Sequence, residues 1–351
     1  ILILILISVF CSEFLLYYFV LSVCKWPKIA SQNGNPVKAI VLADTHILGP
    51  VRGHWLDRMR REWQMHRAFQ TSMTLFNPEV VFILGDLFDE GDIVSNQYFE
   101  QYANRFVRLF QTPRNTKLIC AVGNHDVGFH YRLHPIPIHR FEEKFNNTGV
   151  ELHTIRDVQF VTINSMAMQD DHCYFCEEAQ FKLTEISNIF KCAKNEKYCR
   201  KGGTEKRIRY SRPVLMQHFP TYRASNKECL EHDAPEMEKY REKWDVLSKK
   251  ATRLLGEMLN PRVAFSGHSH HYCKTKTILG IPEYTIASFS WRNKYNPSFL
   301  LATFTPTQHA IELCYLPTEG NIIGIYVFGV CTIIFLILKG LISSCSRSKA
   351  K

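Results

Sequence analysis

The chain has 351 residues, of which 46% are hydrophobic and 22% charged, and this composition excludes a disordered or fibrous protein. Its formal charge of +10 is scattered along the chain, apart from one basic loop and the C-terminal tail. Because no nucleic-acid-binding motif accompanies that charge, we expect no nucleic-acid partner.

The N-terminal segment is almost wholly apolar up to Cys24, with Glu13 as its one charged residue. Its length suits a helix that crosses a membrane. A signal peptide is the alternative, but its apolar part is normally shorter and ends in small residues, whereas Phe14–Val20 is bulky and aromatic. We therefore expect a retained transmembrane helix over residues 1–24 and a linker over 25–36.

The segment 37–317 is predicted to fold as one α/β domain in which buried strands alternate with amphipathic helices. The expected strands are 37–43, 80–84, 118–122, 160–164, 213–217, 263–266, 284–287, 299–304 and 311–316. The expected helices are about 55–76, 96–110 and 177–190. The last three strands have no helix between them, which favours antiparallel pairing.

The stretch 191–212 is basic and contains glycine, so we expect a solvated insertion. A contact with an anionic substrate or with phospholipid headgroups is the alternative.

Cysteines crowd around this insertion, and in an oxidising lumen they would form disulfides that staple it. The cysteines concerned are Cys173, Cys176, Cys192, Cys199 and Cys229. Spacing alone does not give their pairing. A zinc knuckle is the alternative, although a matching second Cys-x-x-Cys pair is missing. Cys120 and Cys314 lie in apolar strand-like runs and are expected to be buried free thiols.

Polar clusters follow five of the predicted strands. They are Asp44-Thr45-His46, Gly85-Asp86-Leu87-Phe88-Asp89, Gly123-Asn124-His125-Asp126, Gln217-His218 and Gly267-His268-Ser269-His270. Each alone could be a turn or a helix cap. Loops beyond the carboxyl ends of strands gather ligands in α/β proteins, so we expect these clusters to converge on one rim. Five such clusters of metal-ligating residue types indicate a metal site.

This ordered set resembles the calcineurin-like metallophosphoesterase superfamily. The pattern of that superfamily is Asp-x-His, Gly-Asp-x-x-Asp, Gly-Asn-His-Asp/Glu, His and Gly-His-x-His, and every block is present in order between residues 37 and 270. The resemblance implies an α/β fold, a calcineurin-like β-sandwich flanked by helices. It also implies a metal-dependent phosphoric ester hydrolase.

The resemblance further assigns ligands to two metal ions. One ion is assigned to Asp44, His46, Asp86 and His270, and the other to Asp86, Asn124, His218 and His268. His125 is implied to act on the scissile phosphate or the leaving oxygen, with Asp89 orienting its ring. Asp126 stands where many relatives have Glu, which leaves its detailed role open.

Two cations roughly 3.5 to 4 Å apart would neutralise the phosphoryl oxygens and lower the pKa of a bound water. Oxygen and nitrogen donors without thiolate favour manganese, iron or zinc over calcium or magnesium. Manganese is favoured by the resemblance. Further histidines are candidates for lining the substrate cleft, with surface positions as the alternative: His130, His134 and His139 in a Pro-containing loop, and His271.

A second apolar run covers residues 322–342 without a polar face, which predicts a transmembrane helix rather than a buried C-terminal helix. Lys339, Arg347, Lys349 and Lys351 lie at its far end, so the positive-inside rule places the tail 343–351 in the cytosol and the domain in a lumen. Asn146-Asn147-Thr148 is an acceptor sequence for N-glycosylation, and Asn146 is its predicted site.

A catalytic domain held between two spans is similar to the branch of the superfamily that remodels glycosylphosphatidylinositol (GPI) anchors. That branch removes ethanolamine phosphate from the second mannose of the anchor glycan. The resemblance implies GPI-anchored proteins as substrates, whose export from the endoplasmic reticulum it permits. It also implies residence in endoplasmic reticulum exit sites, the ER-Golgi intermediate compartment and the Golgi apparatus.

The tail Arg347-Ser348-Lys349-Ala350-Lys351 is similar to dibasic retrieval signals, which implies coat proteins or cargo receptors of early secretory traffic as partners. A simple positive-inside flank is the alternative. Two other functions remain open: a lumenal phosphatase or phospholipid phosphodiesterase of other specificity, and a catalytically silent trafficking scaffold. The scaffold is disfavoured because no metal-ligand position is lost.

Overall fold

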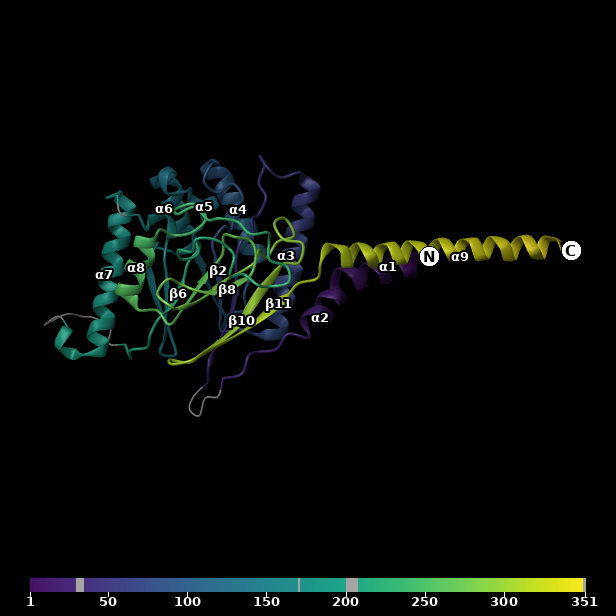
Figure 1. Ribbon diagram of the computed structural model, residues 1–351. Coiled ribbons are helices and arrows are strands. Elements are labelled where there is room, and N and C mark those ends of the chain that lie inside the picture. Colours follow the sequence, from purple (N-terminus) through teal and green to yellow (C-terminus); the bar gives the residue numbers. More distant parts are fainter. Residues whose placement is uncertain (30–34, 170, 200–207, 350–351) are drawn as a thin grey trace.

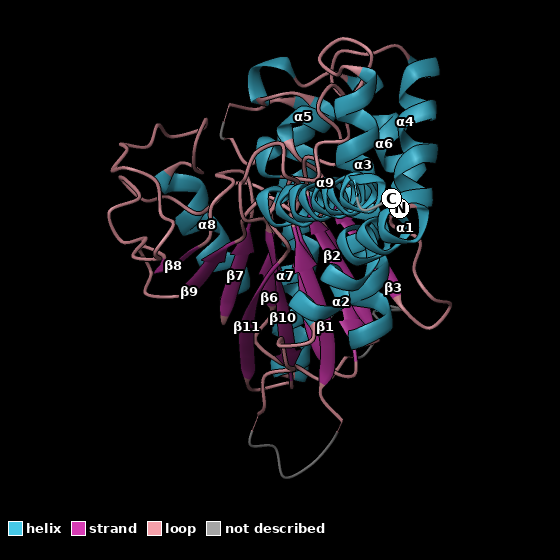
Figure 2. Ribbon diagram, turned by 90° about the vertical axis from the view of Figure 1, so that its right-hand side faces the viewer, coloured by secondary structure: helices cyan, strands magenta, loops and turns pink. Residues whose placement is uncertain are grey.

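The computed structural model describes residues 1–29, 35–169, 171–199 and 208–349. Residues 200–207 of the predicted basic insertion and the last two residues of the tail lie outside the described residues. The described chain forms two stacked β-sheets with helices on their outer faces, and two apolar helices leave the domain on one side (Figures 1 and 2). The expected fold class is confirmed.

The first sheet has the strand order β11-β10-β1-β2-β3. Its strands are β1 (Val37–Leu42), β2 (Val80–Leu84), β3 (Lys117–Ala121), β10 (Ser298–Phe304) and β11 (His309–Tyr315). β1, β2 and β3 run parallel, whereas β10 and β11 are antiparallel additions on the other side of β1. The carboxyl ends of β1, β2 and β3 therefore lie at one edge.

The second sheet has the strand order β4-β5-β6-β7-β9-β8. Its strands are β4 (Glu151–Ile155), β5 (Val158–Thr162), β6 (Val214–Met216), β7 (Val263–Ser266), β8 (Cys273–Lys276) and β9 (Pro282–Thr285). β5, β6, β7 and β9 are parallel, and the antiparallel strands β4 and β8 close the two edges. The prediction of one antiparallel group is confirmed for β10 and β11 but wrong for β9, which lies in the other sheet, parallel to β7 and antiparallel to β8.

Every predicted strand is present, with ends shifted by at most two residues. The edge strands β4 and β8 were not predicted, because their polar and apolar residues mix without a continuous buried run. An edge strand needs only one buried face, so its sequence pattern is weaker.

Helices cover the outer faces of both sheets (Figure 2). They are α3 (Trp55–Phe76), α4 (Asn96–Leu109), α5 (Asn124–Val127), α6 (Pro135–Phe145), α7 (Tyr174–Lys194) and α8 (Lys249–Leu259). The expectation of a Pro-containing loop around His139 is wrong, because α6 begins there with Pro135 in its first turn. Proline is tolerated at that position since the first N–H groups of a helix have no partner within it.

Aromatic side chains fill the space between the two sheets. Phe82 and Phe160 come from opposite sheets, and their ring centroids are 5.0 Å apart. Phe160 also meets Phe304 edge-on at 5.2 Å. These residues are fully buried, so their packing holds the two sheets in a fixed position relative to each other. The carboxyl ends of the parallel strands in both sheets are thereby held in place as well.

The two terminal helices lie side by side as they leave the domain (Figure 1). The N-terminal one comprises α1 (Leu2–Phe10), a π-helical turn (Cys11–Leu15) and α2 (Leu16–Leu21), and the C-terminal one is α9 (Glu319–Lys349). The segments Leu2–Leu21 and Glu319–Ser343 are long and apolar enough to cross a membrane by length and composition.

A buried carboxylate fixes these helices to the domain. The side chain of Glu13 accepts hydrogen bonds from Trp63 Nε1 at 2.7 Å, from Arg60 Nη1 at 3.0 Å and from the hydroxyl of Tyr326 at 2.9 Å. Arg61 of α3 pairs with Glu319 at the start of α9 at 3.1 Å. The N-terminal helix, α3 and α9 are thereby joined in one polar cluster.

The described cysteines form four disulfides, which are Cys24–Cys314, Cys173–Cys176, Cys192–Cys199 and Cys229–Cys273. The alternative of a zinc knuckle built by the cysteines around the insertion is therefore wrong. Cys120 is a buried free thiol, as predicted. Cys314 is not, because the N-terminal segment brings Cys24 against β11.

Candidate metal centre

The five predicted polar clusters meet at the carboxyl ends of the parallel strands of both sheets. Asp44 and His46 follow β1, Asp86 follows β2 and Asn124 opens α5 directly after β3. His218 follows β6, and His268 and His270 follow β7. Since the two sheets stack, the loops from both meet along one rim, where seven polar side chains lie together.

The backbone at this rim is strained in a consistent way. Asp44, His46, Asp86, His268 and His270 all have positive φ angles, of 55°, 42°, 50°, 72° and 58° respectively. Residues with a Cβ occupy this region at a cost of order 1 to 3 kcal/mol each and persist where the surrounding structure over-determines them. Five such residues at one rim indicate that the fold is shaped to hold these side chains.

One group consists of Asp44, His46, Asp86 and His270. The Nε2 atoms of His46 and His270 are 3.1 Å apart. An oxygen of Asp44 lies 3.7 Å from Nε2 of His270, and an oxygen of Asp86 lies 3.5 Å from Nε2 of His46. Two imidazole nitrogens and two carboxylates that face one another at these distances suit a divalent cation between them.

The second group shares Asp86 and adds His218, His268 and Asn124. Nε2 of His218 lies 3.2 Å from Asp86 Oδ2 and 3.1 Å from Asn124 Oδ1. Nδ1 of His268 is buried and has no hydrogen-bond partner among the described residues. An unsatisfied buried nitrogen in a cluster of oxygen and nitrogen donors fits a cation ligand.

Outer contacts fix which nitrogen of His218 and of His268 faces the centre. Nδ1 of His218 lies 2.7 Å from the carbonyl oxygen of Leu84, and Nε2 of His268 lies 2.7 Å from that of Trp244. A carbonyl oxygen only accepts, so each of these outer nitrogens carries the hydrogen. The inner nitrogen then directs its lone pair into the cluster, as metal-ligating histidines require.

Burial sets the electrostatics of the rim. It lowers the pKa of His268 to about 3 and that of His270 to about 2, so both imidazoles are neutral. Burial also raises the pKa of the Asp44 carboxyl to about 8, and the negative charge of the nearby Asp86 acts in the same direction. The pKa of Asp86 falls well below its ordinary value because the charges of His218 and His125 outweigh burial. Burial lowers the pKa of His218, but the charge of Asp86 outweighs it and raises the pKa to about 9, so this imidazole carries the proton that pairs with Asp86. A bound cation would take the place of that proton, facing the ionised Asp86 and the neutral His268 and His270.

His125 lies beside the first group, and its ring centroid is 4.8 Å from that of His46. Its Nδ1 lies 3.0 Å from the carbonyl oxygen of Asp89, and its backbone N–H donates to Asp86 Oδ1 at 2.8 Å. The carbonyl can only accept, so Nδ1 carries a hydrogen and Nε2 is the atom available for a substrate.

Asp89 acts on two histidines through different atoms. Its carboxylate Oδ1 lies 3.2 Å from Nδ1 of His46, and its Oδ2 accepts from Arg292 at 3.0 Å. The expectation that this carboxylate holds the His125 ring is therefore wrong, because the backbone carbonyl of Asp89 makes that contact.

Asp126 has a structural role that spacing alone left open. Its buried carboxylate accepts from the backbone N–H of Gly123 at 2.8 Å and from that of Phe88 at 3.1 Å. It thereby ties the loop after β2 to the loop after β3. A Cβ at Gly123 would meet the backbone nitrogen and Oδ1 of Asp86, so glycine is needed for this close approach.

The further predicted candidates are not gathered at the two groups. His134 caps α6 through its ring, and His139 is exposed on α6 and pairs with Glu142 at 3.2 Å. His271 contacts Ser269 and Tyr240. His130 contacts Met166 and Asp171. Asn146 is exposed at the end of α6, where a glycan has access.

Two neighbours of the site were not predicted. The hydroxyl of Ser165 accepts from the backbone N–H groups of His218 and Phe219 at 3.2 and 3.0 Å and so fixes the loop after β6. Arg292 reaches the rim through Asp89. Neither stands in a motif of its own, so no spacing in the sequence indicated them.

The comparisons with known proteins agree with this geometry. Residues 37–272 match the calcineurin-like phosphoesterase family. The chain is 51% identical over 323 residues to the Metallophosphoesterase 1 homolog of Drosophila melanogaster, with 91% of this chain and 86% of that protein covered. It is 43% identical over 343 residues to Metallophosphoesterase 1 of Ailuropoda melanoleuca, with 95% and 86% covered. Among solved structures, a dimetal phosphatase from Danio rerio is similar in fold, with a TM-score of 0.50 at 9% identity, covering 80% of this chain and 97% of that one.

Proposed function

Because the chain belongs to the calcineurin-like phosphoesterase family and is a metal-dependent phosphoesterase, we propose that it removes ethanolamine phosphate from the second mannose of GPI-anchored proteins. The observation that carries the chemistry is the position of Asp86. One carboxylate oxygen of this residue lies 3.5 Å from His46 and 3.2 Å from His218, between the two donor groups. A carboxylate in that position can bridge two cations.

Two bound cations supply positive charge to the phosphoryl oxygens and make a nucleophile available near neutral pH. Asp44, His46, Asp86 and His270 would hold one, and Asp86, Asn124, His218 and His268 the other. We propose manganese by resemblance. The nitrogen and oxygen donors also suit iron or zinc.

His125 is the proposed acid for the leaving oxygen. Its Nδ1–H is held by the carbonyl of Asp89, so Nε2 can give a proton to the departing mannose oxygen. As a cation, His125 would also stabilise negative charge that develops on the phosphoryl group. Asp89 is a positioning residue for both His125 and His46.

We propose that the N-terminal helix and α9 cross a membrane and carry the domain on the lumenal side. The basic residues Lys339, Arg347 and Lys349 lie at the end of α9 away from the domain, which supports a cytosolic tail. The four disulfides suit an oxidising compartment, and the exposed Asn146 suits glycosylation there.

The orientation of α3 supports a substrate that is itself attached to the membrane. α3 runs across the direction of the two terminal helices at the point where they leave the domain (Figure 1). Its side chains Leu56 and Met59 are exposed, and Trp63 contacts Phe14 of the N-terminal helix. Residues 47–54 connect His46 to the start of α3, and we propose that α3 faces the bilayer surface.

The decisive experiment uses the full chain in vesicles with a GPI glycan that bears ethanolamine phosphate on the second mannose, with and without manganese. We expect release of ethanolamine phosphate only with metal, and no release from a matched glycan that bears the group on another mannose. Hydrolysis of a generic phosphodiester without release from the glycan would replace this substrate with another one. No hydrolysis of either compound by metal-loaded protein would favour the silent scaffold.

The tail provides a separate test of location. We propose residence in endoplasmic reticulum exit sites, the ER-Golgi intermediate compartment and the Golgi apparatus, with coat proteins or cargo receptors binding the tail. Replacing Arg347 and Lys349 by serine should move the protein later in the secretory route, whereas Ser344→Ala should not. If the double variant keeps the distribution of the unchanged protein, the basic residues of the tail only set the membrane topology.

A further inference from the structure

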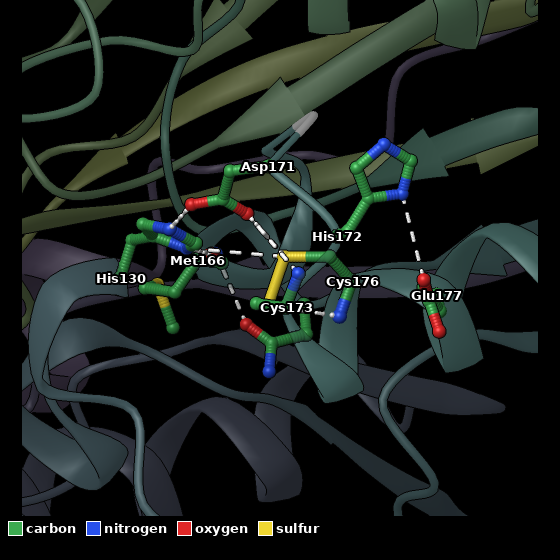
Figure 3. The surroundings of a disulfide bond; sticks show 8 residues. His130, Met166, Asp171, His172, Cys173, Cys176 and Glu177 are labelled. Atoms are coloured by element: carbon green, nitrogen blue, oxygen red, sulfur yellow. Dashed lines mark hydrogen bonds and ion pairs between the residues drawn. A yellow bond between two sulfur atoms is a disulfide. The ribbon is translucent and has the colours of Figure 1, made fainter.

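A second cluster of reactive side chains lies outside the metal centre, at the start of α7. Cys173 caps the helix and forms a disulfide with Cys176 in its first turn, and Asp171 and His130 stand beside the pair (Figure 3). Cys173 is half-buried, whereas Cys176 is buried. The phosphoesterase chemistry uses none of these four residues.

The position of Cys173 favours its departure as a thiolate. The backbone N–H of Cys176 donates to Sγ of Cys173 at 3.1 Å, and the amino end of a 21-residue helix stabilises negative charge there. A thiolate that is stabilised in this way is a good leaving group in disulfide exchange.

A carboxylate lies beside the other sulfur and is held in place on both of its oxygens. Oδ1 of Asp171 lies 3.7 Å from Sγ of Cys176, and Oδ2 of Asp171 lies 2.6 Å from Nε2 of His130. The hydrogen bond with His130 lowers the pKa of Asp171, so the carboxylate is ionised, and its Oδ1 also accepts from the backbone N–H of Cys173 at 3.3 Å. His130 is anchored in turn to the carbonyl oxygen of Met166 at 2.9 Å.

Cys176 also borders a cavity of about 620 Å³ between α7 and α8. Lys243, Lys249, Lys250 and Arg253 line this cavity, against a single acidic residue, Glu257. Its apolar floor includes Met168 and Leu254. A wall with this excess of positive charge suits a small anionic ligand.

We propose that Cys173–Cys176 is a thiol–disulfide exchange site for an anionic low-molecular-weight thiol of the glutathione class, bound in this cavity. The thiol loses its proton to solvent and attacks Sγ of Cys176 as the thiolate. The disulfide breaks, Cys173 leaves as a thiolate and takes up a proton, and Cys176 carries a mixed disulfide. A second thiolate attacks the sulfur of the bound thiol, and Cys176 leaves as a thiolate that takes up a proton. Two external thiols thereby become one external disulfide, and the chain keeps two thiols.

The site lies close in sequence to the metal centre. His130 follows His125 of α5 by five residues, and it contacts Asp171 beside the disulfide.

The test treats the full metal-loaded chain with reduced glutathione or, separately, with uncharged 2-mercaptoethanol, and follows each disulfide by alkylation and mass spectrometry. Cys192–Cys199 is the internal reference, because it is another short-loop disulfide with both cysteines half-buried. If exposure alone decided the rate, Cys192–Cys199 would open first, because both of its cysteines are half-buried whereas Cys176 is buried. The proposal predicts that glutathione opens Cys173–Cys176 about tenfold faster than the reference, with the mixed disulfide on Cys176.

The charge of the cavity is tested by a double variant, Lys249→Gln with Arg253→Gln. With glutathione, this variant should lower the ratio of the opening rate of Cys173–Cys176 to that of Cys192–Cys199. With 2-mercaptoethanol, the same ratio should stay unchanged. Opening of Cys192–Cys199 first, a mixed disulfide on Cys173, or equal preference with both thiols would each overturn the proposal.

Discussion

The carboxylate of Asp89 lies 3.2 Å from Nδ1 of His46. It makes this nitrogen the donor, so Nε2 of His46 directs its lone pair at Asp86 and His270. The same residue serves His125 through its backbone carbonyl. A change of the Asp89 side chain therefore removes the contact that orients His46 and keeps the backbone contact that holds His125.

Asp89→Ala should weaken binding of the cation that His46 contacts by roughly 10- to 100-fold, as for other residues that orient metal ligands. The backbone carbonyl remains, so turnover at saturating metal should be largely kept. The measurement is activity against metal concentration, with Asp57→Ala on exposed α3 as the control. A loss of activity that excess metal does not restore would contradict the divided role.

His125→Ala should lower kcat by roughly 10²- to 10⁴-fold, because it removes the proposed proton donor. The backbone N–H that holds Asp86 is retained, so the metal content should stay that of the unchanged protein. Metal analysis and kcat are measured on the same sample, with His134→Ala as the control. A loss of metal would instead make His125 a ligand.

Gly123→Ala should disturb the site through Asp86. The added Cβ would meet the backbone nitrogen and Oδ1 of that residue, and overpacking of this kind costs about 1 to 3 kcal/mol. We expect a lower unfolding temperature and reduced metal content. Gly324→Ala is the control, since nothing lies within 4 Å of a Cβ there. Normal metal binding by Gly123→Ala would exclude this close approach.

The convergence of the candidate metal ligands could be predicted from the sequence because each follows a buried strand, and parallel strands bring their carboxyl ends to one edge. The positioning residues could not be predicted in this way. Arg292 and Ser165 reach the rim from loops without a motif, and the contact of His125 with a backbone carbonyl depends on no particular side chain. Such contacts are set by three-dimensional proximity alone.

The errors in the predicted fold have similar causes. Cys314 sits in an apolar strand, which suggested a free thiol, but its partner Cys24 lies 290 residues away in the N-terminal segment. α6 was missed because two prolines begin it, although Pro135 stands where a helix tolerates proline. The parallel pairing of β9 with β7 depends on sheet order, which strand patterns do not encode.

Asp233 joins two loops and gives a prediction about pH. It accepts from Lys294 Nζ and from Asn296 Nδ2, both at 2.8 Å, and these contacts outweigh burial and lower its pKa. A lowered folded-state pKa adds stability above the unfolded value of about 3.9, and this stability is lost as pH falls.

Asp233→Asn should therefore lower the free energy of unfolding by at most about 1 kcal/mol near neutral pH, since the group is partly exposed. The difference from the unchanged protein should stay constant between about pH 5 and pH 7, begin to shrink near the unfolded-state value of about 3.9 and vanish only below the lowered folded-state pKa. Unfolding midpoints across this range are the measurement. A difference that grows as pH falls would have the wrong sign.

The central claim is that one carboxylate, Asp86, joins two cations that together hydrolyse a phosphoric ester. Its most direct test is the metal stoichiometry and phosphodiesterase activity of Asp86→Asn, with the unfolding temperature measured to show that the variant is folded. We predict two metal ions in the unchanged chain, at most one in the variant, and a fall in kcat/KM of about a thousandfold or more. A folded variant that keeps two metal ions and its activity would contradict the claim.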